Sequence, residues 1–126
     1  MDNKIEQIPV FFAVDDTYVP FLGIALQSLI DHSSENYCYM IKILYTSIND
    51  ANKAKIEKMQ KDNIQIEFVD LNYYIERISD KLYTRDYYTK ATYFRLFVPD
   101  LYPQFDKALY LDSDIIIRED VANLYN

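Results

Sequence analysis

The stretch that decides the fold is Ile8-Pro9-Val10-Phe11-Phe12-Ala13-Val14, followed at once by Asp15-Asp16. An unbroken apolar run of this length predicts a strand that is buried on both faces and therefore lies inside a parallel sheet. Ligands of open α/β sheets bind outside the carboxyl ends of such strands. The two carboxylates therefore mark a candidate site at the end of a central strand.

The next segments continue with a helix and a second strand. Apolar residues recur at helical spacing from Leu22 to Ile30, and Pro20 falls in the first turn, where a helix tolerates it. Tyr39 to Tyr45 is again mostly apolar, which predicts a second buried strand.

A second helix and a third strand follow in the same order. Ser47 or Asn49 is expected to cap a charged helix that runs to about Asp62. Residues 64–68 alternate apolar and polar side chains, the pattern of a half-exposed strand. The order strand, helix, strand, helix, strand predicts an α/β fold of the doubly wound type.

The second half of the chain gives weaker patterns. Residues 71–85 are expected to be irregular or a short helix, and residues 89–98 a helix stopped by Pro99. Residues 107–111 predict a fourth strand, and residues 115–117 a further extended run.

Composition limits the class of protein and its partners. The chain has 126 residues, half of them hydrophobic, so we expect one domain over residues 1–126 with a substantial core. A net charge of −7 disfavours a nucleic-acid partner. No apolar run is long enough to span a bilayer, and the N-terminus lacks the order of a signal peptide. With Cys38 as its only cysteine, the chain is expected to be cytoplasmic, or peripheral to a membrane in a longer protein.

The single glycine, Gly23, excludes the glycine-rich loops that bind phosphate through backbone amides. A nucleotide diphosphate would then need another source of positive charge. A metal ion held by carboxylates is the natural substitute.

Two acidic clusters follow predicted strands, Asp15-Asp16 and Asp112-Ser113-Asp114. If these strands are neighbours, four carboxylates meet at one rim of the sheet. Residues two apart in an extended chain point the same way, so Asp112 and Asp114 would face one ion and Ser113 would not. Such oxygen ligands suit Mg²⁺ or Mn²⁺, although aspartates after strands also form turns and helix caps.

Four segments together resemble the family 8 retaining glycosyltransferases of the lipopolysaccharide galactosyltransferase type. The segments are Phe12–Tyr18, Asn63–Asp70, Lys90–Pro99 and Lys107–Asp114, and their order along the chain matches that of the family. The resemblance implies a Rossmann-like GT-A nucleotide-sugar-binding fold with a mostly parallel sheet flanked by helices. It also implies a UDP-hexose donor, a divalent cation (usually Mn²⁺), a glycan or lipopolysaccharide acceptor, and transfer with retention.

The resemblance assigns the uridine to the turn after the first strand. Ala13, Asp15 and Tyr18 fall where the family holds the uridine, through the base edge and by stacking. Thr17 stands where some relatives have an asparagine, and both side chains can form hydrogen bonds.

The diphosphate and the sugar are assigned to the second half of the chain. Asp112 and Asp114 fall on the family's metal pair, and Asp112 also lies near the donor sugar. Ser113, between them, is counted with Asp112 among the residues expected to bind the substrate. Arg95 falls where a basic residue reaches the donor.

The family's third metal ligand is a histidine in a segment resembling His-x-x-Gly-x-x-Lys-Pro, and this sequence contains no such segment. We therefore expect a truncated domain that holds part of the donor site and has its catalytic residues beyond Asn126. Such a fragment is expected to be inactive alone.

Two other functions remain open. A receiver domain of a response regulator would use Asp15 and Asp16 for Mg²⁺ and Asp70 as phosphoacceptor, but it would place a lysine after a late strand, whereas Lys107 precedes one. A non-catalytic interaction module of the same fold is the third alternative.

Overall fold

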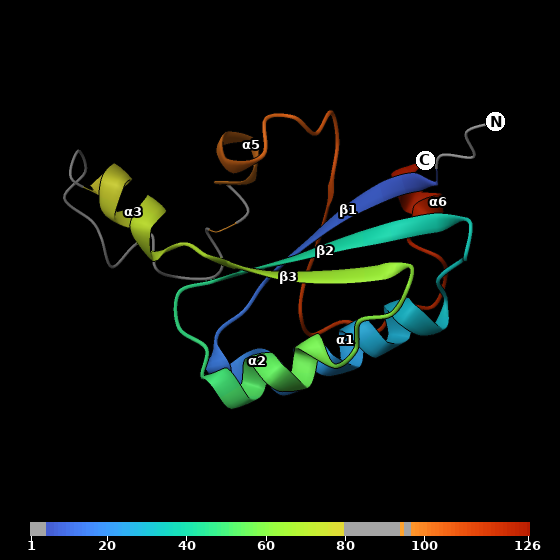
Figure 1. Cartoon of the computed structure of the whole chain (residues 1–126), viewed down its shortest axis with the longest axis horizontal. Helices are drawn as coiled ribbons and strands as arrows, with labels where there is room; N and C mark the ends of the chain where they lie inside the picture. The colour runs from blue at the N-terminus through green and yellow to red at the C-terminus, as the bar shows by residue number, and fades with distance from the viewer. Residues whose placement is uncertain (1–4, 80–93, 95–96) are drawn as a thin grey trace.

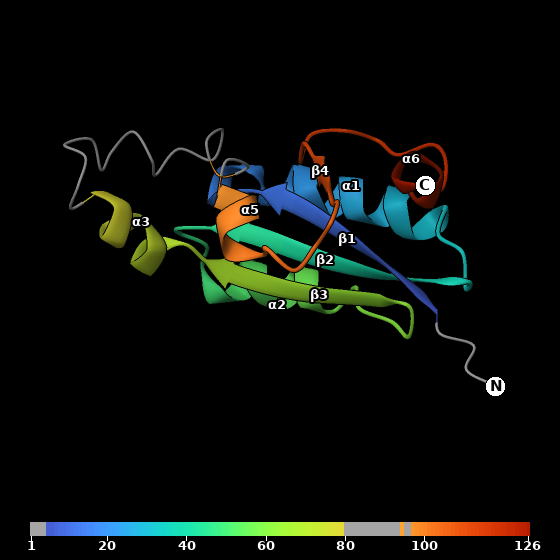
Figure 2. The ribbon, with the colours of Figure 1, turned by 90° about the horizontal axis from the view of Figure 1, so that it is seen from above.

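A computed structural model of the protein describes residues 5–79, 94 and 97–126. Four strands form one sheet in the order β3-β2-β1-β4, as Figure 2 shows. The strands are β1 (Glu6–Ala13), β2 (Tyr37–Tyr45), β3 (Ile64–Asp70) and β4 (Leu109–Leu111). Every pairing in this sheet is parallel, which confirms the predicted α/β class.

Strand β1 lies inside the sheet, as its apolar sequence predicts. It pairs with β2 over its full length and with β4 over Val10–Phe12. Its side chains alternate between two cores, because successive residues of a strand point to opposite faces. Val10 and Phe12 belong to one core, and Phe11 and Ala13 to the other.

The first core lies between the sheet and the helices α1 (Val19–Asp31) and α2 (Asp50–Glu57), which cover one face (Figure 1). The predicted stripe of α1 is buried here through Leu22, Ala25, Leu26 and Leu29. Burial of an aliphatic side chain of this size contributes about 1.5–3 kcal/mol. The short helix α6 (Ala122–Tyr125) adds Ala122 to the same core.

Helix α2 begins where the sequence suggests but ends earlier. The backbone N–H of Asn52 donates to the side chain of Asn49 at 2.8 Å, so Asn49 rather than Ser47 is the cap. The helix ends at Glu57 instead of near Asp62. The cause is a tight turn in which Lys61 and Ile64 exchange backbone hydrogen bonds and lead the chain into β3.

The second core covers the other face of the sheet. Its buried members are Phe11, Ala13, Leu44, Leu71, Ile75, Phe94 and Phe97. Helices α3 (Asn72–Ser79) and α5 (Val98–Leu101) lie on this side, opposite α1 and α2 (Figure 1).

The second half of the chain departs from the prediction at Pro99, and part of what was predicted there is not described. Pro99 was expected to stop a helix, but it lies in the first turn of α5, where its missing N–H costs no hydrogen bond. Most of the predicted helix 89–98 lies outside the described residues. Residues 115–117, expected as an extended run, have no regular secondary structure and pair with no strand of the sheet.

The described helices include none that is both long and apolar enough to cross a bilayer.

Candidate functional site

The candidate site is built where β1 and β4 end side by side. Phe12 pairs with Leu111, so Ala13, the last residue of β1, and Asp112, the first residue after β4, lie at the same level of the sheet. The sequence could not show whether these two strands are neighbours, and the structure shows that they are. Both strands are parallel, so this rim is the carboxyl edge where α/β sheets bind ligands.

A cavity of about 310 Å³ opens at this rim. Its lining comes from both strand ends and from the turn before α1: Ala13, Val14, Tyr18, Tyr110, Asp112, Ser113 and Asp114. Asp112 and Asp114 are both exposed, so their carboxylates are open to a ligand. Five of the residues singled out from the sequence therefore border one cavity.

The backbone after β4 differs from the expected extended chain. Ser113 and Asp114 lie in a turn, and Ser113 lines the cavity together with its two neighbours. The extended backbone from which Ser113 was expected to point elsewhere is therefore absent, because the alternation of side chains holds only while the strand continues.

Asp15 has a structural role at the start of the next element. Its side chain accepts the backbone N–H of Thr17 at 3.0 Å and caps the 3₁₀ helix η1 (Asp16–Tyr18). Asp15 and Thr17 are exposed and lie outside the lining of the cavity. Their assignment to the uridine stays a prediction.

Asp16 is held away from the cavity by α2. Its Oδ1 accepts the backbone N–H of Asn49 at 2.9 Å and the side-chain amide of Asn52 at 3.1 Å. The expected meeting of four carboxylates is therefore incomplete. Asp112 and Asp114 remain as the candidate metal pair.

Tyr18 presents an aromatic ring at the mouth of the cavity. Its side chain is 46% exposed, and its ring contacts that of Phe21 with 5.9 Å between centroids. The ring is thus supported by the first turn of α1 and still offers a face to a planar ligand. Arg95 lies outside the described residues, and its role stays a prediction.

The ligands at this rim suit a hard divalent cation with open coordination positions. Asp112 and Asp114 supply carboxylate oxygens, which Mg²⁺ and Mn²⁺ prefer. Within residues 5–79, 94 and 97–126, no group of three or more His, Cys, Asp or Glu side chains gathers as a complete metal site. Two carboxylates that leave positions for phosphate oxygens are the arrangement by which Mg²⁺ binds nucleotides.

Val14 and Tyr110 line the cavity but were not singled out from the sequence. Tyr110 lies between Leu109 and Leu111, which pack against the first core, so alternation along β4 turns Tyr110 to the opposite face. That alternation was visible in the sequence. Its link to the site required the pairing of β4 with β1.

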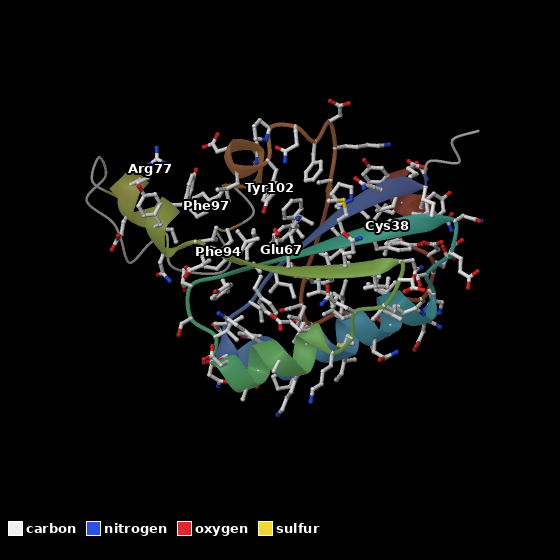
Figure 3. All side chains as sticks on the ribbon, in the orientation of Figure 1. Cys38, Glu67, Arg77, Phe94, Phe97 and Tyr102 are labelled. Carbon is white, nitrogen blue, oxygen red and sulfur yellow. The ribbon has the colours of Figure 1, made fainter. Side chains whose placement is uncertain are left out.

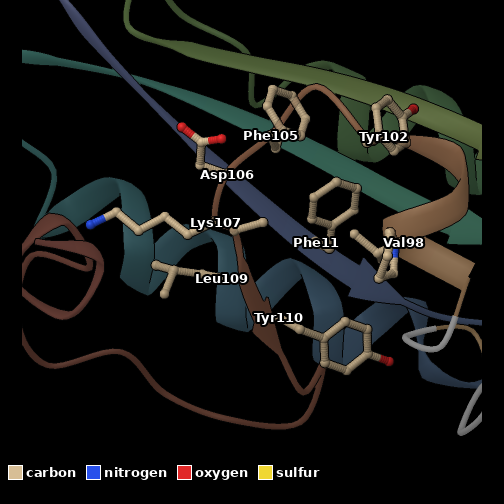
Figure 4. A pocket seen from close by; sticks show the side chains of 10 residues that line it. Phe11, Val98, Tyr102, Phe105, Asp106, Lys107, Leu109 and Tyr110 are labelled. Carbon is tan, nitrogen blue, oxygen red and sulfur yellow. The ribbon is translucent and has the colours of Figure 1, made fainter.

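A second cavity, of about 350 Å³, lies on the α5 side of the sheet and is shown in Figure 4. It is mainly apolar, with Phe11, Tyr102 and Phe105 among its lining residues. Tyr110 borders both cavities and separates the apolar one from the acidic one.

A pair of charged side chains on β2 and β3 contacts the end of α5 beside this second cavity. Lys42 pairs with Glu67 at 3.0 Å. The hydroxyl of Tyr102 donates to the same carboxylate at 3.4 Å, and Figure 3 labels Glu67 and Tyr102. Burial, together with the nearby charge of Glu67, raises the pKa of Tyr102 to about 12. These contacts position α5 and do not reach the acidic rim.

The topology argues against a receiver domain. Asp16 is engaged by α2, and Asp70 accepts hydrogen bonds from the backbone and side chain of Asn72. Asp70 ends the edge strand β3, and β2 separates it from β1. The phosphoacceptor that a receiver needs beside Asp15 and Asp16 would therefore lie on a strand that is not adjacent to β1.

Comparison with known proteins points to one family. The family model of glycosyl transferase family 8 matches residues 9–126. General stress protein A of Bacillus subtilis (strain 168) is 27% identical over 98% of this chain. Lipopolysaccharide 1,2-glucosyltransferase of Escherichia coli (strain K12) is 29% identical over 97% of it. The chain spans 43% and 36% of the length of these two relatives.

Solved structures agree with the sequence comparison. The apo structure of the WbbM bifunctional glycosyltransferase matches 99% of this chain and 22% of its own, with a TM-score of 0.82 and 27% identity. The galactosyltransferase LgtC, solved with donor and acceptor sugar analogs, matches 94% of this chain and 42% of its own, with a TM-score of 0.68 and 26% identity.

These matches settle the fold and the family together. The parallel sheet flanked by helices is the GT-A arrangement of these glycosyltransferases, as the sequence predicted. The chain belongs to glycosyl transferase family 8.

Proposed function

We propose that this chain supplies the donor-binding part of a metal-dependent hexosyltransferase. The reaction is transfer of a hexose from a UDP-sugar to a glycan or lipopolysaccharide-type acceptor, with retention at the anomeric carbon. The observation that carries the proposal is the cavity in which Tyr18, Asp112 and Asp114 meet at the carboxyl edge of the sheet. The relatives named for glucosyl and galactosyl transfer support the reaction class.

Different residues of the cavity contact different parts of the donor in this proposal. The ring of Tyr18 offers a face to the uracil, and a base–aromatic stack contributes about 1–3 kcal/mol in nucleic-acid sites. Ala13, which lines the same cavity, has a small side chain that leaves room for the donor. The hydroxyl of Ser113 offers a hydrogen bond to the donor.

Asp112 and Asp114 hold the cation, Mn²⁺ or Mg²⁺. When bound, the cation supplies positive charge that offsets the charge developing on the departing diphosphate. The position of Gly23 supports this assignment, because the only glycine of the chain lies inside α1 and not at the rim. Backbone amides of a glycine-rich loop therefore cannot take over the neutralisation.

The test is calorimetric titration of UDP with and without Mn²⁺. The wild-type chain is expected to bind UDP at least about tenfold more tightly with Mn²⁺, since metal-mediated phosphate contacts add charge-assisted bonds. The double variant Asp112→Asn, Asp114→Asn is expected to lose this gain and keep the metal-free affinity, because the ring of Tyr18 is untouched.

Asp62→Asn is the matched control. Asp62 is exposed and lies next to the N-terminal end of β3, at the opposite edge of the sheet. An Mn²⁺ effect that survives in the double variant would refute the metal assignment. If the wild-type chain shows no Mn²⁺-dependent binding of UDP, the non-catalytic interaction module is the better description.

A further inference from the structure

The segment that carries the two metal-binding aspartates has no regular structure of its own. Residues 112–121, here called the connecting segment, run from the end of β4 to the start of α6. Backbone N–H groups outside helices and strands need other partners when they are buried. Those partners therefore decide where the connecting segment, and with it Asp112 and Asp114, is placed.

One of these partners is the side chain of Ser28 on α1. Its hydroxyl donates to the carbonyl of Ala25 at 2.7 Å and accepts the backbone N–H of Ile117 at 2.8 Å. The bond to Ala25 fixes the direction of the hydroxyl, because the proton is committed to the helix and a lone pair faces the connecting segment. Ser28, in the middle of the amphipathic helix α1, thus binds the backbone of the connecting segment through its hydroxyl.

Packing holds the same stretch against α1. Ile117 is buried in the first core and Ile115 packs against it, whereas Ile116 between them is 70% exposed. The alternation shows that the stretch lies flat on the core. The hydrogen bond to Ser28 fixes its position along α1, which apolar packing alone does not determine.

The far end of the connecting segment is tied to β2. The hydroxyl of Tyr39 donates to Oδ1 of Asp120 at 2.5 Å, and the backbone N–H of Ala122 donates to the same oxygen at 2.9 Å. The near end is fixed by the pairing of β4 with β1. Ser28 is thus the intermediate anchor, and it holds the backbone three residues beyond Asp114.

We propose that Ser28 is a positioning residue for the metal pair, acting through the backbone of Ile117 on the direction of the Asp112 and Asp114 carboxylates. This inference rests on the proposed function. Each residue between anchors adds two soft backbone dihedrals, so loss of the Ser28 anchor lets the turn at Asp114 sample more orientations. Gathering both carboxylates on one cation then costs more conformational entropy.

The test compares Ser28→Ala with the wild type in the titration of UDP with and without Mn²⁺. The gain in UDP affinity that Mn²⁺ provides is expected to fall about three- to tenfold in Ser28→Ala, the change that corresponds to the net loss of one intramolecular hydrogen bond. Metal-free affinity is expected to stay unchanged. Ser28→Thr retains a hydroxyl and is expected to restore the gain.

Ser33→Ala is the matched control. Its hydroxyl donates to the carbonyl of Ile30 at 2.7 Å just beyond the end of α1, the same type of bond that Ser28 makes to Ala25. An undiminished Mn²⁺ gain in Ser28→Ala would overturn the proposal. So would an equal loss of affinity with and without Mn²⁺, because that would mark a general disturbance of the fold.

Amide hydrogen exchange at Ile117 separates this inference from the proposed function, because it needs no ligand. The Ile117 amide is expected to exchange faster in Ser28→Ala than in the wild type, and at the wild-type rate in Ser33→Ala. An unchanged exchange rate of the Ile117 amide in Ser28→Ala would show that the hydroxyl of Ser28 does not hold this amide. A wild-type chain without Mn²⁺-dependent UDP binding would instead overturn the metal site that the anchor is proposed to serve.

Discussion

Tyr39 shows how a single residue joins distant parts of this chain. Its side chain is fully buried, and its hydroxyl accepts the backbone N–H of Ser34 at 3.0 Å while donating to Asp120. Burial raises the pKa of Tyr39 well above its ordinary value, and the hydrogen bond to Asp120 raises it further. The neutral phenol is therefore the form that the folded chain stabilises.

Tyr39→Phe is expected to lower the free energy of unfolding by about 1–3 kcal/mol at neutral pH, because Asp120 and the Ser34 amide each lose a buried partner. This deficit is expected to shrink at alkaline pH. Above about pH 10, Tyr39 ionises in the unfolded chain and not in the folded one. The free energy of unfolding of the wild type therefore falls by about 1.4 kcal/mol per pH unit, and that of Tyr39→Phe does not fall for this reason.

Urea unfolding of both proteins at about pH 8 and about pH 11 measures the effect. Tyr74 and Tyr102, whose pKa values burial raises to about 12, are present in both proteins and cancel in the comparison. If the difference in free energy of unfolding between the wild type and Tyr39→Phe stays constant over this pH range, the folded chain does not stabilise the neutral phenol.

Residues that line the candidate cavity could be predicted from the sequence where a local pattern marks them. Asp112 and Asp114 were found from their spacing after a strand, and the resemblance to a family added Ala13 and Tyr18. Ser28 could not be found in this way. Its partner, Ile117, lies far along the chain, and nothing near a helical serine signals which segment will cross it.

At the scale of elements, η1 and α2 are joined through Asp16. The two hydrogen bonds that it accepts come from the first residues of α2 and its cap, so the turn after β1 and the helix after β2 support each other. The helix N-terminus also favours a carboxylate by its dipole.

Asp16→Ala is expected to lower the free energy of unfolding by about 1–3 kcal/mol, because the Asn49 amide and the Asn52 side chain lose their acceptor. Asp16→Asn keeps a carbonyl oxygen at the same place and is expected to cost less than about 1 kcal/mol. Chemical unfolding of the three proteins measures the difference. Equal losses in both variants would show that charge, and not the shared acceptor, matters at this position.

Elements could be predicted where hydrophobic periodicity was strong. The apolar runs of β1 and β2 and the stripe of α1 were found with nearly correct bounds. The end of α2 and the place of Pro99 were wrong, because both depend on turns whose hydrogen bonds form between residues that periodicity does not describe.

At the scale of the whole molecule, the site depends on strand order. Sequence patterns gave four strands but left the neighbours of β1 open. The order β3-β2-β1-β4 brings together strand ends that are almost a hundred residues apart in sequence. This order follows from how helices cover both faces of the sheet, which is a property of the assembled chain.

The net charge of −7 is also a property of the whole chain, and it predicts how stability responds to salt. Excess carboxylates repel one another most in the compact state, so screening is expected to stabilise the fold. Between about 0.02 and about 0.5 M NaCl the screening length falls several-fold, and we expect the Tm to rise by a few degrees. The pair Lys42–Glu67 opposes this trend only weakly, since Glu67 is largely exposed.

Thermal unfolding in EDTA measures the effect without divalent cations. In Glu57→Lys, which moves the net charge two units toward neutrality at the exposed end of α2, the rise is expected to be smaller. A Tm that falls with salt would mean that attractive pairs outweigh the net repulsion.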